Sequence, residues 1–365
     1  MEKISLDELN DAIIECRNKM EGADFIEYHF IKYASEELTK KADLKKKPMY
    51  IKSYSHEQAI SIILDFFKSL GVKEWHDQAR KIILSQDKNI GISIFNYPSV
   101  QHSSVTDENG IRLYSCGSCL ESRLDSSEKG ILKKPTPTSL IRISKGNRYI
   151  YYSAYQQISE KDTISLEDIN SIVHEIAHTF DLSNSRENMD KRNMIAEITP
   201  FCVEQLLRNY FIENNIADKS IIDCVYTNRT QDIMHHSRYV FTAVNLMKMQ
   251  KDDGEITKTA IDKFLKDRGV TNIDYVRECF MDVIDSDHDV DYHAKYMIAG
   301  LTAIRFMEMY KKDKNNALEA LKTYCQNLKQ GNVNEKTIEE IGFPSDDRKT
   351  REAVQMITGF SIGER

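Results

Sequence analysis

The feature that most constrains this chain is the pentapeptide His174-Glu-Ile-Ala-His178, which lies within the segment SLEDINSIVHEIAHTFD. Ser165 before Asp168 marks a helix start, because serine caps a helix N-terminus and acids are favoured in its first turn. Apolar side chains then recur at helical spacing, namely Ile169, Ile172, Val173, Ile176 and Ala177. The pattern predicts a buried helix that presents two histidines on one face, since residues four apart are neighbours on a helix.

Two imidazoles at this spacing can bind Zn²⁺ through nitrogens about 2.0–2.1 Å from the ion. Glu175, between them, is not needed as a ligand and can act as a general base toward a water molecule. H-E-x-x-H on a helix is the signature of zinc peptidases. The sequence therefore predicts His174 and His178 as metal ligands and Glu175 as the catalytic base. The alternative is a pair of ordinary histidines on an amphipathic helix.

A catalytic zinc site needs a third protein ligand. One arrangement of such sites has a glycine three residues after His178 and a ligand histidine three residues further on, but this chain has Asp181 and Asn184 there. Asp181 itself is too close to His178 to be a ligand on a separate element. Glu197 fits best, because it follows His178 by 19 residues in RNMIAEITPFCVEQLL, a segment with a helical apolar pattern. Glu204, seven residues later on nearly the same face, is the second candidate ligand, and a carboxylate such as Glu204 or Asp181 is expected to accept the other N–H of a ligand histidine.

Three blocks of the chain resemble the thimet oligopeptidase and oligoendopeptidase F family of zinc peptidases. The first is SLEDINSIVHEIAHTF, the second runs from Ala196 to Glu204, and the third is the segment from His288 to Tyr296. The resemblance implies that Glu197 binds zinc. It also implies that Tyr292 or Tyr296 donates a hydrogen bond to the oxyanion of the reaction and that His288 positions the scissile peptide.

The resemblance covers roughly residues 138–310 and has departures. Ala177 replaces a glycine of the family motif, His288 and Tyr292 are four rather than five residues apart, and Pro200 is one position later than in the family. We expect Pro200 to kink its helix, because proline removes an internal hydrogen bond. Members of the family are usually longer and restricted to short peptides by a helical lobe. The shorter chain leads us to expect a more open cleft that accepts peptides or an exposed segment of a protein.

The predicted fold is mainly α with a small β-sheet (α+β), a zincin-like catalytic core of helices beside a short twisted sheet. Residues 1–90 read as an N-terminal helical region, with a capping box from Ser55 to Gln58 and a stop at Gly71. Residues 91–160 contain short β-rich runs and are expected to form the edge of the cleft. Residues 161–365 are the helical catalytic region. The run 148–155 is the candidate edge strand for aligning an extended substrate, or else a structural strand.

Composition limits the partners. A formal net charge of −7 argues against nucleic acid as the main partner, and no apolar run approaches the length of a membrane span. The first residues lack a basic segment and an apolar segment, so we expect a cytoplasmic protein, with export by a signal-independent route left open. Seven scattered cysteines suit a reducing compartment. Cys116 and Cys119 are turn cysteines or a local redox pair.

These observations predict a zinc-dependent metallopeptidase with one Zn²⁺ per chain and a peptide or protein as substrate. Two alternatives stay open: a catalytically inactive zincin-fold binding or scaffold protein, and a dedicated regulatory or effector protease with a single substrate. Oligomeric state has no signal in the sequence. His235 and His236 are either near the zinc site or simply packed, and Arg305 pairs either with a substrate carboxylate or with an acid at the surface.

Overall fold

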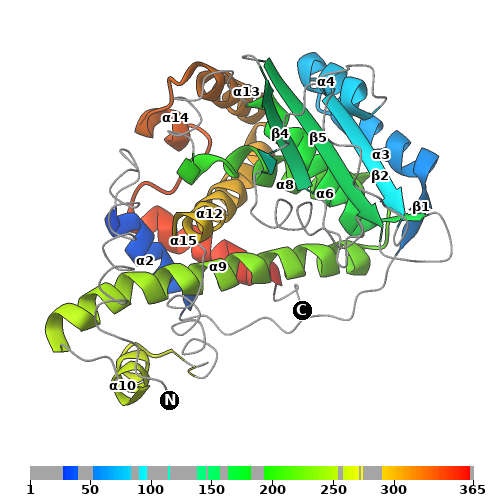
Figure 1. Ribbon diagram of the computed structural model, residues 1–365. Coiled ribbons are helices and arrows are strands. Elements are labelled where there is room, and N and C mark those ends of the chain that lie inside the picture. Colours follow the sequence, from blue (N-terminus) through cyan, green and yellow to red (C-terminus); the bar gives the residue numbers. More distant parts are fainter. Residues whose placement is uncertain are drawn as a thin grey trace.

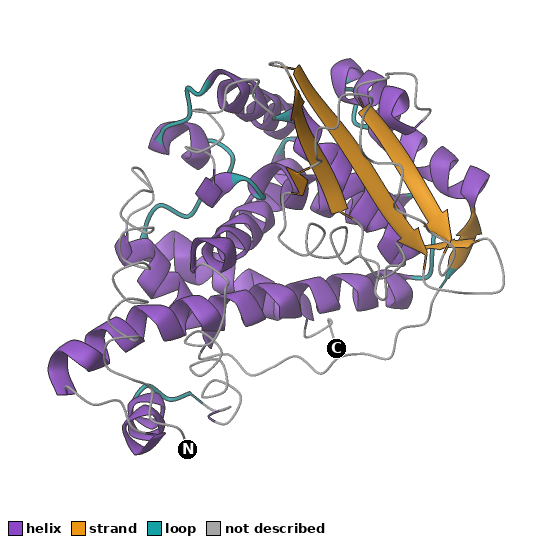
Figure 2. Cartoon of the chain, in the orientation of Figure 1, coloured by secondary structure: helices purple, strands orange, loops and turns teal. Residues whose placement is uncertain are grey.

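The computed structural model describes residues 28–39, 52–83, 90–96, 114–115, 138–144, 147–156, 163–181, 193–253, 258–270, 273 and 290–361. These residues are mostly helical, as predicted, with strands gathered at one side of the molecule (Figures 1 and 2). The helices are α2 (Tyr28–Thr39), α3 (His56–Ser69), α4 (Lys73–Ile83), α6 (Leu166–Ala177), α8 (Ile198–Glu213), α9 (Lys219–Asp253), α10 (Lys258–Asp267), α12 (Val290–Lys312), α13 (Lys314–Gln330), α14 (Glu335–Glu339) and α15 (Asp347–Ser361), with the 3₁₀ turns η1 (His178–Phe180) and η2 (Asn193–Ile195).

Four strands pair in the order β2-β5-β4-β3. They are β2 (Ile90–Asn96), β3 (Tyr114–Ser115), β4 (Thr138–Ser144) and β5 (Asn147–Gln156). Strand β5 pairs in parallel with β2 and antiparallel with β4, so both of its edges are occupied. The prediction that residues 148–155 form an edge strand is therefore wrong. A parallel partner more than 50 residues upstream has no local signal in the sequence, because parallel strands need a long connection.

A second, two-stranded ladder places the helix that carries the histidine motif. Strands β1 (Ser53–Ser55) and β6 (Thr163–Ser165) are antiparallel, with Ser53 opposite Ser165 and Ser55 opposite Thr163. Each strand ends on a serine that caps the next helix. Ser55 closes a capping box with Gln58 at the start of α3, as predicted, and Ser165 closes one with Asp168 at the start of α6. The ladder therefore fixes the starting points of both helices relative to each other.

Helix α6 lies between the sheet and the helical bundle, and it contacts β5 on one side and α8 on the other (Figure 1). Its apolar face is buried as predicted: Ile169, Val173 and Ile176 are inaccessible to solvent. Beyond the end of α6, Phe180 stacks on Trp75 of α4, with ring centroids 5.0 Å apart and an interplanar angle of 3°. Stacking of this kind anchors the last turn of the motif.

Helices α8, α9 and α12 form the bundle on the other side of α6, and α9 runs along the lower part of the molecule in Figure 1. Gly300 of α12 lies so close to α9 that a Cβ atom there would be 2.5 Å from Cδ1 of Ile233. Helix α2, from the N-terminal region, packs against α9 and α15 near the C-terminus. The division into regions 1–90, 91–160 and 161–365 stays a prediction.

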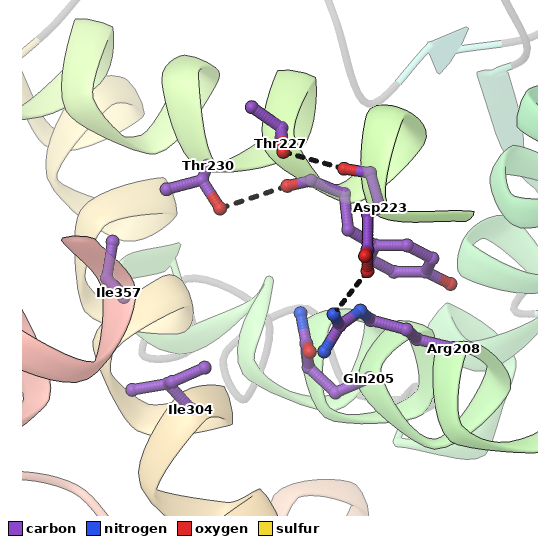
Figure 3. Close-up of a pocket in the computed structure, with 8 residues that line it drawn as sticks. Gln205, Arg208, Asp223, Thr227, Thr230, Ile304 and Ile357 are labelled. Carbon is purple, nitrogen blue, oxygen red and sulfur yellow. Dashed lines mark hydrogen bonds and ion pairs between the residues drawn. The ribbon is translucent and has the colours of Figure 1, made fainter. Parts of the chain in front are cut away.

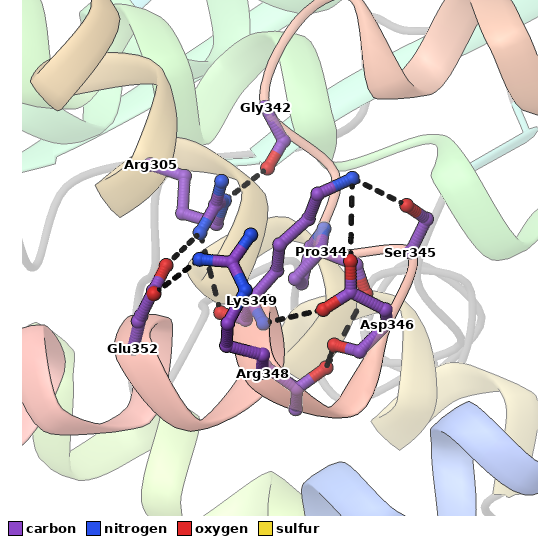
Figure 4. Close-up of polar contacts among 9 residues, drawn as sticks. Arg305, Gly342, Pro344, Ser345, Asp346, Arg348, Lys349 and Glu352 are labelled. Atoms are coloured by element: carbon purple, nitrogen blue, oxygen red, sulfur yellow. Dashed lines mark hydrogen bonds and ion pairs between the residues drawn. The ribbon is translucent and has the colours of Figure 1, made fainter.

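Arg305 of α12 holds the C-terminal segment in place (Figure 4). Its guanidinium donates to the carbonyl oxygens of Gly342 (3.1 Å) and Lys349 (3.3 Å) and pairs with Glu352 at 3.2 Å. Gly342 has φ +101°, a conformation that L side chains rarely adopt. Of the two roles considered for Arg305, the contacts correspond to pairing within the protein. Across the described ranges, none of the helices is long and apolar enough to cross a membrane.

Candidate metal centre

The two motif histidines face each other across one helical turn. His174 is in the last turn of α6 and is 7% exposed, and His178 is the residue at which α6 ends and η1 begins. The backbone of His178 is still in the right-handed helical region, so the four-residue spacing places both rings on one face. Their ring centroids are 4.9 Å apart. The helix predicted from the sequence thus presents both imidazoles as expected.

Glu197 completes a cluster of three metal-binding groups. One ligand atom each from His174, His178 and Glu197 lies within 4.8 Å of the others, the arrangement that a bound metal ion requires. Oε2 of Glu197 is 3.2 Å from Nε2 of His174 and 3.5 Å from Nε2 of His178. Ligand atoms of a tetrahedral zinc site are about 3.4 Å apart, given bonds of about 2.1 Å. Within the described part of the chain, this buried oxygen accepts no hydrogen bond. Two imidazoles and one carboxylate are also the donor set of many catalytic zinc sites, so the residues fit the ion.

Glu197 lies on a bend rather than inside a helix. Helix α8 begins at Ile198, after η2 and a turn, so Glu197 is its N-cap residue and Pro200 is in its first turn. The predicted kink at Pro200 is wrong, because the first backbone N–H groups of a helix have no partner within it and proline loses nothing there. The bend directs the Glu197 side chain toward α6.

Glu204 lies on α8, seven residues after Glu197, and contacts the second ring nitrogen of His174. Its Oε1 is 2.5 Å from Nδ1 of His174, and the carboxylate is fully buried. The imidazole therefore donates Nδ1–H to Glu204 and keeps Nε2 for a metal. Of the two carboxylates considered for this role, Glu204 makes the contact with His174, while Asp181 is buried after η1.

Arg229 of α9 holds Glu204 in turn, a contact that the sequence analysis did not foresee. Its Nε donates to Oε2 at 3.1 Å and its Nη2 to Oε1 at 2.7 Å, and the guanidinium lies 4.6 Å from the centroid of the Phe201 ring. Burial would raise the pKa of Glu204, but Arg229 and His174 lower it to about 2. The polar segment around Arg229 carries no signal of this role in the sequence.

Lys295 of α12 was likewise missed. It is 8% exposed, and its Nζ lies 3.1 Å from Oε1 of Glu197. Burial would raise the pKa of Glu197, but His178, Lys295 and His174 hold it well below the usual range. The available signal was a lysine between Ala294 and Tyr296, at the start of a stretch that continues with mostly apolar residues to Leu301.

The charge of His174 responds to this environment. Burial lowers the pKa of its imidazole, but Glu197, Glu204 and Glu175 raise it to about 9. The imidazole ring therefore lies between two carboxylates, with Glu204 near Nδ1 and Glu197 near Nε2. Glu175, half-buried on α6, lies close enough for its charge to act on His174. A cation that binds at Nε2 has to displace one proton.

The predicted substrate-binding tyrosines lie on α12 beside the cluster. The rings of Tyr292 and Tyr296 are 5.2 Å apart, and Tyr296 also approaches Phe201 at 6.0 Å. Burial, Glu197 and a hydrogen bond with Tyr292 raise the pKa of Tyr296 well above its usual value, so its hydroxyl keeps its proton. His288 lies outside the described residues, as do Cys116 and Cys119.

His236 of α9 packs against this group. Its ring stacks on Tyr296 at 4.5 Å, and its Nδ1 is 2.9 Å from Nδ1 of His293. Burial and His293 lower the pKa of His236 to about 2, so the ring is neutral. His235 contacts the ring of Tyr239 at 4.9 Å. Of the two adjacent histidines, His236 is therefore the one beside the candidate site.

A small cavity lies between α8, α9, α12 and α15 (Figure 3). Its volume is about 30 Å³, enough for one or two water molecules. Arg208 pairs with Asp223 at 2.8 Å in its wall. Tyr226, also in the wall, donates to the carbonyl oxygen of Glu204 at 2.9 Å. The cavity is too small for an amino acid, and Tyr226 links its wall to the backbone of Glu204.

Comparison with known proteins supports the fold. No family model matches the chain, and no curated protein does. A crystal structure of a candidate peptidase from Chlamydophila abortus matches with a TM-score of 0.51 and 16% identity, over 98% of this chain and 56% of that one. A candidate oligoendopeptidase F from Bacillus anthracis str. Ames matches with a TM-score of 0.47 and 11% identity, over 100% of this chain and 57% of that one. The chain thus spans a little over half the length of these structures, and it shares the helical fold of the first.

Proposed function

We propose that this chain is a zinc-dependent peptidase of the H-E-x-x-H plus glutamate type, related to the thimet oligopeptidase and oligoendopeptidase F family. The observation that carries the proposal is the convergence of Oε2 of Glu197 on the Nε2 atoms of His174 and His178, at 3.2 and 3.5 Å. The His174–Glu204–Arg229 contacts support it, because a ligand histidine is usually held by a carboxylate through its second nitrogen.

His174, His178 and Glu197 would hold one Zn²⁺, which when bound polarises the peptide carbonyl and acidifies a water molecule. Glu175 takes the proton of the attacking water on its carboxylate and delivers it to the nitrogen of the leaving amine. Tyr296 keeps its proton and donates a hydrogen bond to the developing oxyanion, with Tyr292 and His288 as further substrate contacts. Substrates are peptides or an exposed segment of a protein.

The test combines metal content with activity. Protein purified without added zinc should contain about one zinc per chain by elemental mass spectrometry and should cleave members of a peptide library. Glu175→Gln should keep the zinc and lose at least about 10³-fold in kcat, the upper range for general-base catalysis. Glu167→Gln is the matched control, because Glu167 is exposed in the first turn of the same helix.

Two outcomes would reject the proposal. Folded protein that neither contains zinc nor takes it up would leave the binding or scaffold alternative. Activity of Glu175→Gln equal to that of Glu167→Gln would remove Glu175 as the base.

A further inference from the structure

Lys295 pairs directly with the candidate metal ligand Glu197, and its position is unusual for a lysine. Lysine side chains are rarely buried unless they are paired. Lys295 is 8% exposed, and its ammonium lies 4.9 Å from the ring centroid of Tyr292 and 5.1 Å from that of Tyr296. Two aromatic rings and one carboxylate thus lie around the ammonium and hold it in a fixed place.

The two oxygens of the Glu197 carboxylate face different partners. Oε1 is the oxygen that Lys295 contacts, at 3.1 Å. Oε2 is the oxygen that faces the Nε2 atoms of His174 and His178. With Oε1 held by the ammonium, Glu197 can offer a single oxygen to a metal ion, and the remaining coordination position is left for water or substrate.

Charge is balanced in the same way on both sides of His174. The two buried glutamates of the site, Glu197 and Glu204, each pair with a cation: Lys295 for the first and Arg229 for the second. Buried carboxylates without a partner are strongly destabilising. Since the partners are side chains of α9 and α12, neither glutamate needs a metal ion for compensation.

We infer that Lys295 is a positioning residue with two effects: it presents Glu197 as a one-oxygen ligand, and it keeps the metal-free site folded, so that the chain binds and releases its metal without unfolding. The second effect concerns the metal-free protein alone. The first rests on the proposed function, because it requires that a metal binds. A consequence is that Lys295 weakens metal binding, since its ammonium competes for Glu197 and repels a divalent cation.

The test is Lys295→Met, which removes the charge and keeps an unbranched side chain one heavy atom shorter. Lys314→Met is the matched control, because Lys314 pairs with Glu213 at the same kind of distance, 3.2 Å, on the exposed surface. Calorimetry should show that the chelator-treated Lys295→Met variant melts at least about 5 °C below wild type. The melting temperature of the zinc-loaded variant should fall by less than half as much, and that of the control Lys314→Met should change by about 1 °C or less.

Zinc affinity is measured by competition with a chromophoric chelator. Because stabilisation by a ligand reflects its affinity for the folded state, Lys295→Met should bind zinc about tenfold more tightly than wild type. Three results would overturn the inference. The first is an equal fall in melting temperature for the metal-free and zinc-loaded forms, and the second is a metal-free fall no larger than that of Lys314→Met. The third is weaker zinc binding by Lys295→Met than by wild type.

A double variant keeps the test decisive if Lys295→Met does not fold without metal. Lys295→Met with Glu197→Gln removes both charges, so its metal-free form should fold and melt above the single variant. A double variant that is no more stable than the single one would overturn the inference. Wild-type protein that binds no zinc would refute the proposed function, whereas the melting temperatures of the metal-free variants would still decide whether Lys295 stabilises Glu197.

Discussion

Removal of Arg229 offers a direct measurement of how the metal centre is supported. Glu204 is fully buried, and Arg229 donates two hydrogen bonds to it. In Arg229→Met the carboxylate would keep His174 as its charged partner within the described part of the chain. Breaking a buried pair from one side costs about 3–5 kcal/mol. The fall in the pKa of Glu204 from 4.5 to about 2 corresponds to about 3 kcal/mol, which includes the share of His174. We therefore expect Arg229→Met to lose about 3 kcal/mol of unfolding free energy.

Arg208→Met is the control for this measurement. Arg208 also pairs with an acid, Asp223 at 2.8 Å, and also lies over an aromatic ring, that of Tyr226 at 5.6 Å. The difference is burial, since the side chain of Asp223 is 27% exposed and that of Glu204 is 1% exposed. Partly exposed pairs contribute about 1 kcal/mol or less. The control should therefore lose about a third of what Arg229→Met loses.

The assay is urea unfolding of the metal-free protein, followed by zinc competition. Adding Glu204→Gln to Arg229→Met should recover part of the loss, because the uncompensated carboxylate is then gone. Zinc affinity of Arg229→Met should fall by about 10- to 100-fold, the usual effect of losing support for a ligand histidine. Equal losses for Arg229→Met and Arg208→Met, or an additive double variant, would refute the reasoning that burial of Glu204 sets the cost.

Two further predictions concern the helices around the site. Gly300→Ala should destabilise the protein by about 1–3 kcal/mol in urea unfolding, because its Cβ would lie 2.5 Å from Ile233. Adding Ile233→Ala should restore part of that loss. A Gly300→Ala variant as stable as wild type would mean that α9 and α12 can move apart without a cost in free energy. Tyr296→Phe should lower kcat by about 100-fold with the zinc content unchanged, whereas a kcat within twofold of wild type would transfer the oxyanion role to Tyr292.

The sequence predicted those features of the structure that depend on residues near each other in the chain. The capping serines Ser55 and Ser165, the buried face of α6 and the spacing of the two histidines all follow from side chains within a few turns of each other. Glu197 was also found from its position in the chain. Its setting was not, because α8 begins at Ile198 instead of extending back through Met194.

Features that depend on distant segments escaped the sequence analysis. Arg229 and Lys295 reach the site because α9 and α12 pack against α8. Arg229 looks like an ordinary helix cation in the sequence, and the apolar neighbours of Lys295 indicate burial but not its partner. Strand β5 was taken as an edge because its pairing with β2 joins segments about 60 residues apart, as in Ile90 opposite Ile150. Tertiary contacts of this kind override local preference.

The ladder of β1 and β6 has a consequence for how the protein folds. Pairing of Ser53 with Ser165 closes a loop of about 110 residues before α6 acquires a fixed origin. Closing such a loop costs entropy that local helix formation does not, and contacts of large sequence separation slow folding. Helix α6 depends mainly on local contacts, but its position relative to the rest of the molecule is fixed only after β1 pairs with β6. We expect refolding to show a late phase that substitutions in the short segment 53–55 slow, although that segment contributes no ligand.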